Sequence, residues 1–175
     1  MPRDEFGANG AVITNGDKAT LIFRRRLEHP PEVVWKAITE PSQLASWYMT
    51  KAVIDCREGG SIDFVSGPSR LHVTGRILVW KPPLVFEHEW KVESRAELPS
   101  GEDAIIHWEL HGDGAGTVLH LEHRKLNTQT ALGFAPGTHA FMDRLEAYLG
   151  KQSLPNWQER YQQIAAQYPP SWTTK

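Results

Sequence analysis

Apolar and polar residues alternate with a period of two over most of residues 11–125, a pattern typical of β-strands with one buried face. Two apolar runs, 11–14 and 19–23, flank Asn15-Gly16-Asp17-Lys18, and Asn-Gly is the strongest short signal for a hairpin turn. The second strand continues through Arg24-Arg25-Arg26 to Leu27. Turn residues separate six further strands, at 51–56, 61–65, 71–80, 84–92, 103–111 and 117–125. The pattern therefore predicts a hairpin strand followed by an antiparallel meander.

Helical spacing interrupts this pattern early and replaces it at the end. Pro30-Pro31 ends a strand and begins a helix that carries Val34, Trp35 and Ile38 on one face, and a second short helix is predicted over residues 42–48. A long helix ends near Gly150, and its start is left open because Gly133, Pro136 and Gly137 interrupt the pattern. The long helix presents an apolar stripe of Thr138, Phe141, Leu145 and Tyr148.

These elements predict an α+β domain over residues 11–150, in which helices cover one face of a curved antiparallel sheet. Residues 1–10 form a flexible tail in this scheme, and residues 151–175 an amphipathic helix and tail. The stripe of Leu154, Trp157, Tyr161, Ile164 and Tyr168 must dock on something, because so short a helix is marginal alone in water. We expect it to dock on its own domain, with a subunit interface or a lid as the alternatives.

Strand parity separates a covered face from a solvated face. Phe86, His88 and Trp90 share one face, and the neighbouring strands continue it with Ile106, Trp108, Leu110, Leu119, Leu121 and His123. The opposite positions are charged or histidine. We therefore expect Phe86, Trp90, Trp108, Leu119 and Leu121 to face the helix that carries Phe141. The pattern alone does not decide between a filled core and a cavity.

Several motifs resemble the START-like (SRPBCC) superfamily, and in particular the branch named after the C-terminal domain of the activator of heat shock protein 90 ATPase. The resemblance covers roughly residues 11–150, and its order matches throughout. The quoted motifs are the stretch 24–48, Glu58-Gly59-Gly60, Pro82-Pro83-Leu84-Val85-Phe86, Gly116-Thr117 with Leu119-His120-Leu121-Glu122-His123, and Phe141-Met142-Asp143-Arg144-Leu145. One departure is His88, at a position where the branch commonly has an aromatic residue.

The resemblance implies a helix-grip fold, with the long C-terminal helix lying across a sheet of six to seven strands and a cavity between them. It also implies a hydrophobic or amphipathic small molecule as ligand, in a stress-related setting. The residues expected to line the cavity are Trp35, Trp47, Phe64, Phe86, His88, Trp90, Trp108, Leu121, His123, Phe141 and Leu145. The alternatives are an enzyme of the cyclase or hydrolase type and a chaperone-associated interaction module. The length of 175 residues leaves no room for the activator's second domain, which argues against a chaperone partner.

Composition narrows the partners further. The net charge is 19 − 21 = −2, which argues against nucleic acid as a partner. No apolar run approaches the ~20 residues of a membrane span, and the lone Cys56 gives no sign of secretion, so we expect a cytoplasmic protein without membrane insertion. A homodimer stays open.

No catalytic residue, metal or cofactor is assigned from the sequence, although a proton-transfer role for His88 and His123 is an alternative. His107 and His111 have a metal-ligand spacing for a helix, but on a strand they lie about 13 Å apart.

Overall fold

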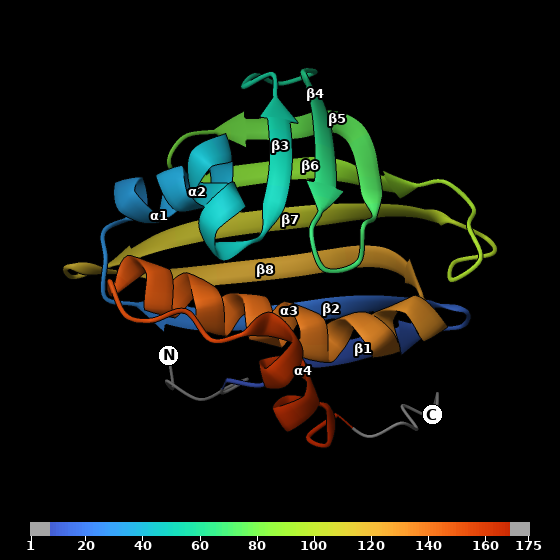
Figure 1. Cartoon of the computed structure of the whole chain (residues 1–175). Coiled ribbons are helices and arrows are strands. Elements are labelled where there is room, and N and C mark those ends of the chain that lie inside the picture. Colours follow the sequence, from blue (N-terminus) through green and yellow to red (C-terminus); the bar gives the residue numbers. More distant parts are fainter. Residues whose placement is uncertain (1–7, 169–175) are drawn as a thin grey trace.

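One antiparallel sheet carries the fold, and its helices lie against one face (Figure 1). The structure is a computed structural model of the chain and describes residues 8–168. The eight strands are β1 (Ala11–Asn15), β2 (Lys18–Leu27), β3 (Thr50–Ile54), β4 (Ser61–Ser66), β5 (His72–Lys81), β6 (Val85–Val92), β7 (Glu102–Asp113) and β8 (Gly116–Asn127). The four helices are α1 (Pro31–Thr39), α2 (Pro41–Trp47), α3 (Thr128–Leu149) and α4 (Trp157–Ala165).

The strand order is β1-β2-β8-β7-β6-β5-β4-β3. The hairpin of β1 and β2 turns at Gly16, whose φ of +63° is accessible to glycine without strain. Eight strands agree with the number of segments that the alternation predicts and exceed the six to seven that the resemblance implies, because β1 pairs with β2 along its whole length and extends the sheet beyond β2. The helix-grip architecture itself is confirmed.

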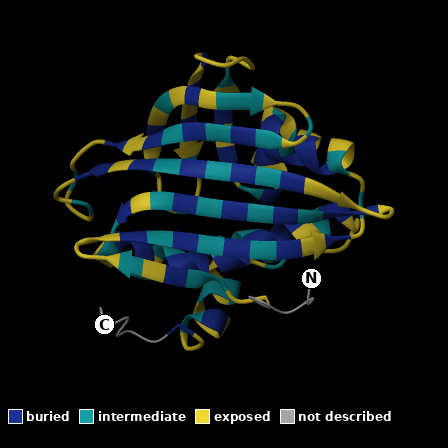
Figure 2. Ribbon diagram, turned by 180° about the vertical axis from the view of Figure 1, so that it is seen from behind, coloured by how far each residue is buried: buried dark blue, intermediate teal, exposed yellow. Residues whose placement is uncertain are grey.

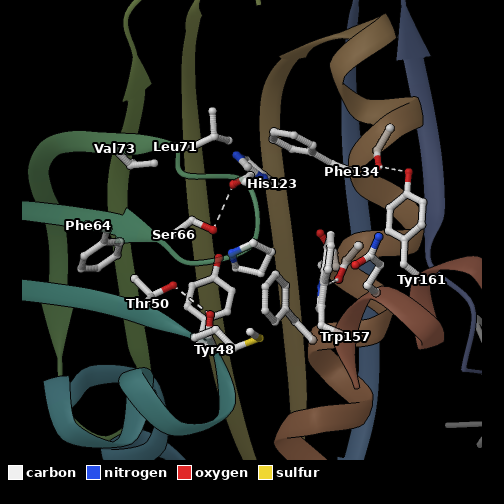
Figure 3. Close-up of a pocket in the computed structure, with 18 of the residues that line it drawn as sticks. Tyr48, Thr50, Phe64, Ser66, Leu71, Val73, His123, Phe134, Trp157 and Tyr161 are labelled. Atoms are coloured by element: carbon white, nitrogen blue, oxygen red, sulfur yellow. Dashed lines mark hydrogen bonds between the residues drawn. The ribbon is translucent and has the colours of Figure 1, made fainter. Parts of the chain in front are cut away.

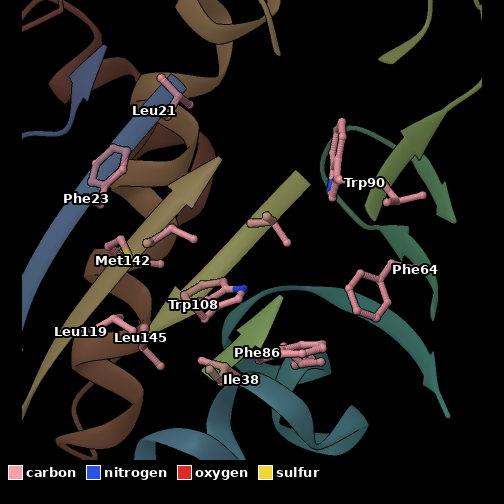
Figure 4. Packing of buried hydrophobic residues seen from close by; sticks show 14 of the residues in the cluster. Leu21, Phe23, Ile38, Phe64, Phe86, Trp90, Trp108, Leu119, Met142 and Leu145 are labelled. Carbon is pink, nitrogen blue, oxygen red and sulfur yellow. The ribbon is translucent and has the colours of Figure 1, made fainter. Parts of the chain in front are cut away.

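The predicted parity is also confirmed. Phe86 pairs with Trp108, and Trp108 pairs with Leu121, so the three share one face. Trp108 and Leu121 are only 4% and 2% exposed. Figure 4 shows Trp108 and Leu119 packed beneath the helices. Figure 2 shows the opposite face, where intermediate and exposed positions alternate with buried ones along each strand.

Phe86 corrects one detail of that expectation. It lies beside Trp35 and Ile38 of α1 rather than under α3, with its ring 6.2 Å from the Trp35 ring (Figure 4). The physical reason is the length of β6, because Phe86 and Trp90 are four residues, or about 13 Å, apart along one strand. The two ends of β6 therefore lie under different helices.

The long helix α3 begins at Thr128 and continues through Pro136. Pro136 has no N–H, so one hydrogen bond to the preceding turn of the helix is missing. Gly133 and Gly137 lie on either side of this position. Both glycine carbonyls accept hydrogen bonds from α4, with Tyr161 Oη donating to Gly133 at 3.0 Å and Trp157 Nε1 donating to Gly137 at 3.1 Å. A Cβ on Gly137 would lie 3.0 Å from the Trp157 ring, so glycine permits this close approach.

Further contacts hold α4 and the segment after it on the same domain. Arg160 Nε lies 2.7 Å from Asp143 of α3, and Asp143 also pairs at 3.0 Å with the buried Arg25 of β2. Tyr168 is buried, and its hydroxyl accepts a hydrogen bond from the Gly10 amide at 2.7 Å. Most of the predicted N-terminal tail, and the end of the predicted C-terminal tail, fall outside the described residues. Within residues 8–168, no helix combines the length and the hydropathy that a bilayer crossing requires.

Candidate functional site

A pocket of about 710 Å³ lies between α3 and α4 on one side and strands β4 to β6 on the other (Figure 3). That volume is within the range of about 300–1,000 Å³ that is usual for small-molecule sites. The residues that line it are Tyr48, Met49, Thr50, Phe64, Ser66, Pro68, Ser69, Leu71, Val73, Trp90, His123, Gly133, Phe134, Gly137, Thr138, Phe141, Asn156, Trp157, Gln158, Tyr161 and Gln162.

Aromatic rings form much of the wall. Trp157 lies against both Phe141 and Tyr161, at ring-centroid distances of 5.4 and 5.3 Å. Deeper in the pocket, the Phe134 ring lies 5.5 Å from Trp90 in an edge-to-face arrangement. Such rings offer a large apolar contact area with fixed geometry, which suits an apolar ligand.

The polar part of the wall is neutral. No Asp, Glu, Lys or Arg is found among the described residues that line the pocket. The polar side chains there belong to serine, threonine, asparagine, glutamine, tyrosine and histidine. Burial raises the pKa of Tyr48 to about 12, so its phenol also stays uncharged at neutral pH. A bound ion would therefore find no counter-charge in this wall.

His123 of β8 is the pocket residue with the most strongly altered environment. It is 4% exposed, and burial, with a smaller contribution from nearby His88, lowers its pKa to about 3. His88 occupies the same cross-strand row, separated from His123 by Ile106, and burial lowers its pKa to about 4. His88 Nδ1 lies 2.7 Å from the Glu89 carbonyl oxygen and donates to it, whereas His123 Nε2 has no hydrogen-bond partner among the described residues.

A small void of about 20 Å³ lies under the pocket floor. It shares Tyr48, His123, Thr138 and Phe141 with the pocket, so the two spaces are adjacent. The rest of its wall is core, namely Leu21, Phe23, Ile106, Trp108, Leu121 and Met142. Its size is sufficient for one water-sized group.

The expected cavity residues separate into three sets. Phe64, Trp90, His123 and Phe141 line the pocket, and Trp108 and Leu121 line the small void with His123 and Phe141. The others line neither space, because they are buried in the packed core. These core residues are Trp35, Trp47, Phe86, His88 and Leu145.

The sequence reasoning missed the α4 side of the pocket. Trp157 and Tyr161 had been assigned to a docking stripe, and they both dock on α3 and form the pocket wall. Their spacing of four residues was the available signal. Ser66 and Leu71, at the turn between β4 and β5, also line the pocket. No sequence pattern predicted this, because their position at the pocket depends on the curvature of the sheet.

No group of three or more possible metal ligands comes together anywhere in residues 8–168. His107, from the pair considered above, lies on the outer face of the sheet with Nδ1 2.6 Å from Glu87. The charged face of the sheet is thus separate from the pocket.

Comparison with known proteins agrees with the fold. Residues 28–150 match the family model described as Activator of Hsp90 ATPase homolog 1-like protein. No curated protein matches the chain. Among solved structures, CalU16 from Micromonospora echinospora is 25% identical with a TM-score of 0.67, over 91% of this chain and 92% of that one.

Two further structures show the same fold at lower identity. Protein MLL2253 from Mesorhizobium loti is 22% identical with a TM-score of 0.68, over 77% of this chain and 99% of its own. The BPP1335 protein from Bordetella parapertussis is 21% identical with a TM-score of 0.68, over 95% and 92%. The chain belongs to the Activator of Hsp90 ATPase homolog 1-like family, within the START-like superfamily.

Proposed function

We propose that this protein binds a hydrophobic or amphipathic small molecule in the pocket between α3, α4 and the sheet. The observation that carries the proposal is a volume of about 710 Å³ whose wall, within residues 8–168, has seven aromatic side chains and no charged ones. An apolar ligand in this pocket buries apolar surface, and each Å² of buried apolar surface contributes a favourable free energy of about 25 cal/mol. The family match supports a ligand-binding fold without naming the ligand.

Binding is favoured over the cyclase or hydrolase alternative by the state of the pocket's titratable groups. A general acid or base works best with a pKa near the operating pH. The pKa of His123 is about 3 and that of Tyr48 about 12, both far from neutrality. No carboxylate lies in the described wall to take the role instead.

Titration with N-phenyl-1-naphthylamine, an uncharged dye that brightens in apolar surroundings, tests the proposal. We expect saturable binding with one dye per chain. Thr138→Trp should weaken it at least tenfold, because Thr138 lines both the pocket and the void and a tryptophan there would occupy dye space.

The matched control is Val53→Trp, because Val53 is 65% exposed on β3 and does not line the pocket. This variant should bind the dye as the parent protein does, and melting curves should confirm that both variants are folded. A linear, unsaturable dye signal, or equal binding by the two tryptophan variants, would contradict the proposal.

A further inference from the structure

The floor of the pocket has an unusual polar atom. His123 is 4% exposed, and its ring packs beside Trp90 and Phe134, with centroid distances of 4.8 and 6.1 Å. Its Nε2 is buried without a hydrogen-bond partner among the described residues. A buried polar group left without a partner is destabilising, so most such groups in proteins are satisfied.

The missing hydrogen bond is specific to the position of His123, because the other buried histidine of this row, His88, is hydrogen-bonded. His88 shares the cross-strand row and the apolar surroundings, but its Nδ1 donates to the Glu89 carbonyl at 2.7 Å. His88 lines neither the pocket nor the void. The unpaired nitrogen is thus on the histidine that borders both spaces.

The void beside His123 has the size of one small polar group. Its volume of about 20 Å³ accommodates a water or a hydroxyl, since roughly 10–15 Å³ measured in this way is enough for one water. Besides His123, the side chains around it that carry polar atoms are Tyr48, Thr138 and Trp108. All four are uncharged at neutral pH.

We infer that the pocket selects uncharged ligands that carry a hydroxyl group, and that this hydroxyl enters the void and hydrogen-bonds to His123 Nε2. This inference rests on the proposed binding function. A hydroxyl can donate or accept, so it serves either neutral tautomer of His123. The apolar remainder of the ligand lies against the aromatic wall formed by Phe134, Phe141 and Trp157.

The same wall disfavours a carboxylate ligand of the fatty-acid kind. Burying an ionised carboxylate without a partner is strongly unfavourable. The described wall offers no Lys or Arg, and the pKa of about 3 keeps His123 uncharged at neutral pH. A carboxylate also has two oxygens, which the void of about 20 Å³ does not accommodate together.

Three probes of nearly the same shape separate these effects. Naphthalene, 2-naphthol and 2-naphthoate compete at pH 7 against N-phenyl-1-naphthylamine bound to the whole chain. We expect 2-naphthol to bind about five- to tenfold more tightly than naphthalene, within the roughly two- to twelvefold effect of one added hydrogen bond. We expect 2-naphthoate to bind at least tenfold more weakly than 2-naphthol.

Variants locate the preference. His123→Phe should reduce the advantage of 2-naphthol over naphthalene to less than twofold, whereas His88→Phe, the control from the same row, should leave it unchanged. If His123→Phe does not fold, His123→Leu takes its place, because it also removes the ring nitrogen that the inference invokes. That variant should reduce the advantage at least twofold.

The possible outcomes test the selectivity for a hydroxyl separately from the proposed binding function. Saturable naphthalene binding with no preference for 2-naphthol, or tighter binding of 2-naphthoate, would overturn the inference and leave the binding function standing. Retention of the full preference in the folded His123→Phe variant would also overturn it. If neither the dye nor any naphthalene probe binds, the binding function fails and the inference fails with it.

Discussion

Acidification from pH 6.5 to about 4.5 should reduce the free energy of unfolding by about 6 kcal/mol, comparable to the whole stability of many small domains. The cause is the burial of three histidines, which lowers the pKa of His88 and of His139 to about 4 and that of His123 to about 3. In the unfolded chain all three titrate near 6.5. Between these values the unfolded chain binds more protons than the folded protein, so stability falls as the pH falls.

Each histidine contributes about 2 kcal/mol over this interval, less than the full 1.4 kcal/mol per pH unit because the unfolded histidines are already half protonated at pH 6.5. Urea denaturation at a series of pH values measures the total. His123→Phe should lower the slope by about a third, whereas His72→Phe should not change it, because His72 is 61% exposed in its pair with Asp63. A free energy that stays flat between pH 6.5 and 4.5 would show that the histidines are not buried as described.

Replacing Arg144 with methionine should destabilise the protein by about 3–4 kcal/mol, on the basis of three lost hydrogen bonds to a buried charged group. Arg144 of α3 is 8% exposed and donates to three backbone carbonyls. Nε reaches Trp47 at 2.8 Å, Nη2 reaches Ser46 at 3.1 Å, and Nη1 bonds to Pro155. The guanidinium thus joins the end of α2 to the segment that leads into α4.

Chemical denaturation at pH 7 measures this loss. Arg144→Lys should recover only a small part of it, because an ammonium on a flexible stem does not reproduce a planar fork with fixed donor directions. The control is Arg57→Met, since Arg57 is 68% exposed in its pair with Asp55 and such pairs contribute about 0–1 kcal/mol. A loss at position 144 no larger than that at position 57 would contradict the role given to Arg144.

The fold was largely predictable from the sequence, because strand periodicity and turn residues are local features of the chain. The period of two placed Trp108 and Leu121 on the covered face, and Asn15-Gly16 marked the first hairpin. The start of α3 was harder to place, because Pro136 reads as a helix break although the helix continues through it. Helix capping and proline rules describe preferences that tertiary packing overrides.

The pocket was only partly predictable, since parity shows which side chains are covered and not what covers them. Trp47 and Trp90 are both predicted to lie on covered faces, yet Trp47 of α2 is fully buried in the core and Trp90 borders the pocket. Trp157 was recognised as part of a docking stripe, but its place in the wall depends on the approach of α4 to Gly137. Such contacts between distant segments leave no period in the sequence.

The tryptophan indole signals of the protein, recorded by ¹H–¹⁵N NMR with and without saturating N-phenyl-1-naphthylamine, provide the most direct measurement of ligand position. Trp90 and Trp157 line the pocket, whereas Trp35 and Trp80 lie together near α1, with ring centroids 5.1 Å apart. Binding in the pocket should shift the Trp90 and Trp157 signals and leave those of Trp35 and Trp80 in place. Shifts confined to Trp35 and Trp80, or no shift at Trp90 and Trp157 when the dye is saturating, would contradict a ligand site between α3, α4 and the sheet.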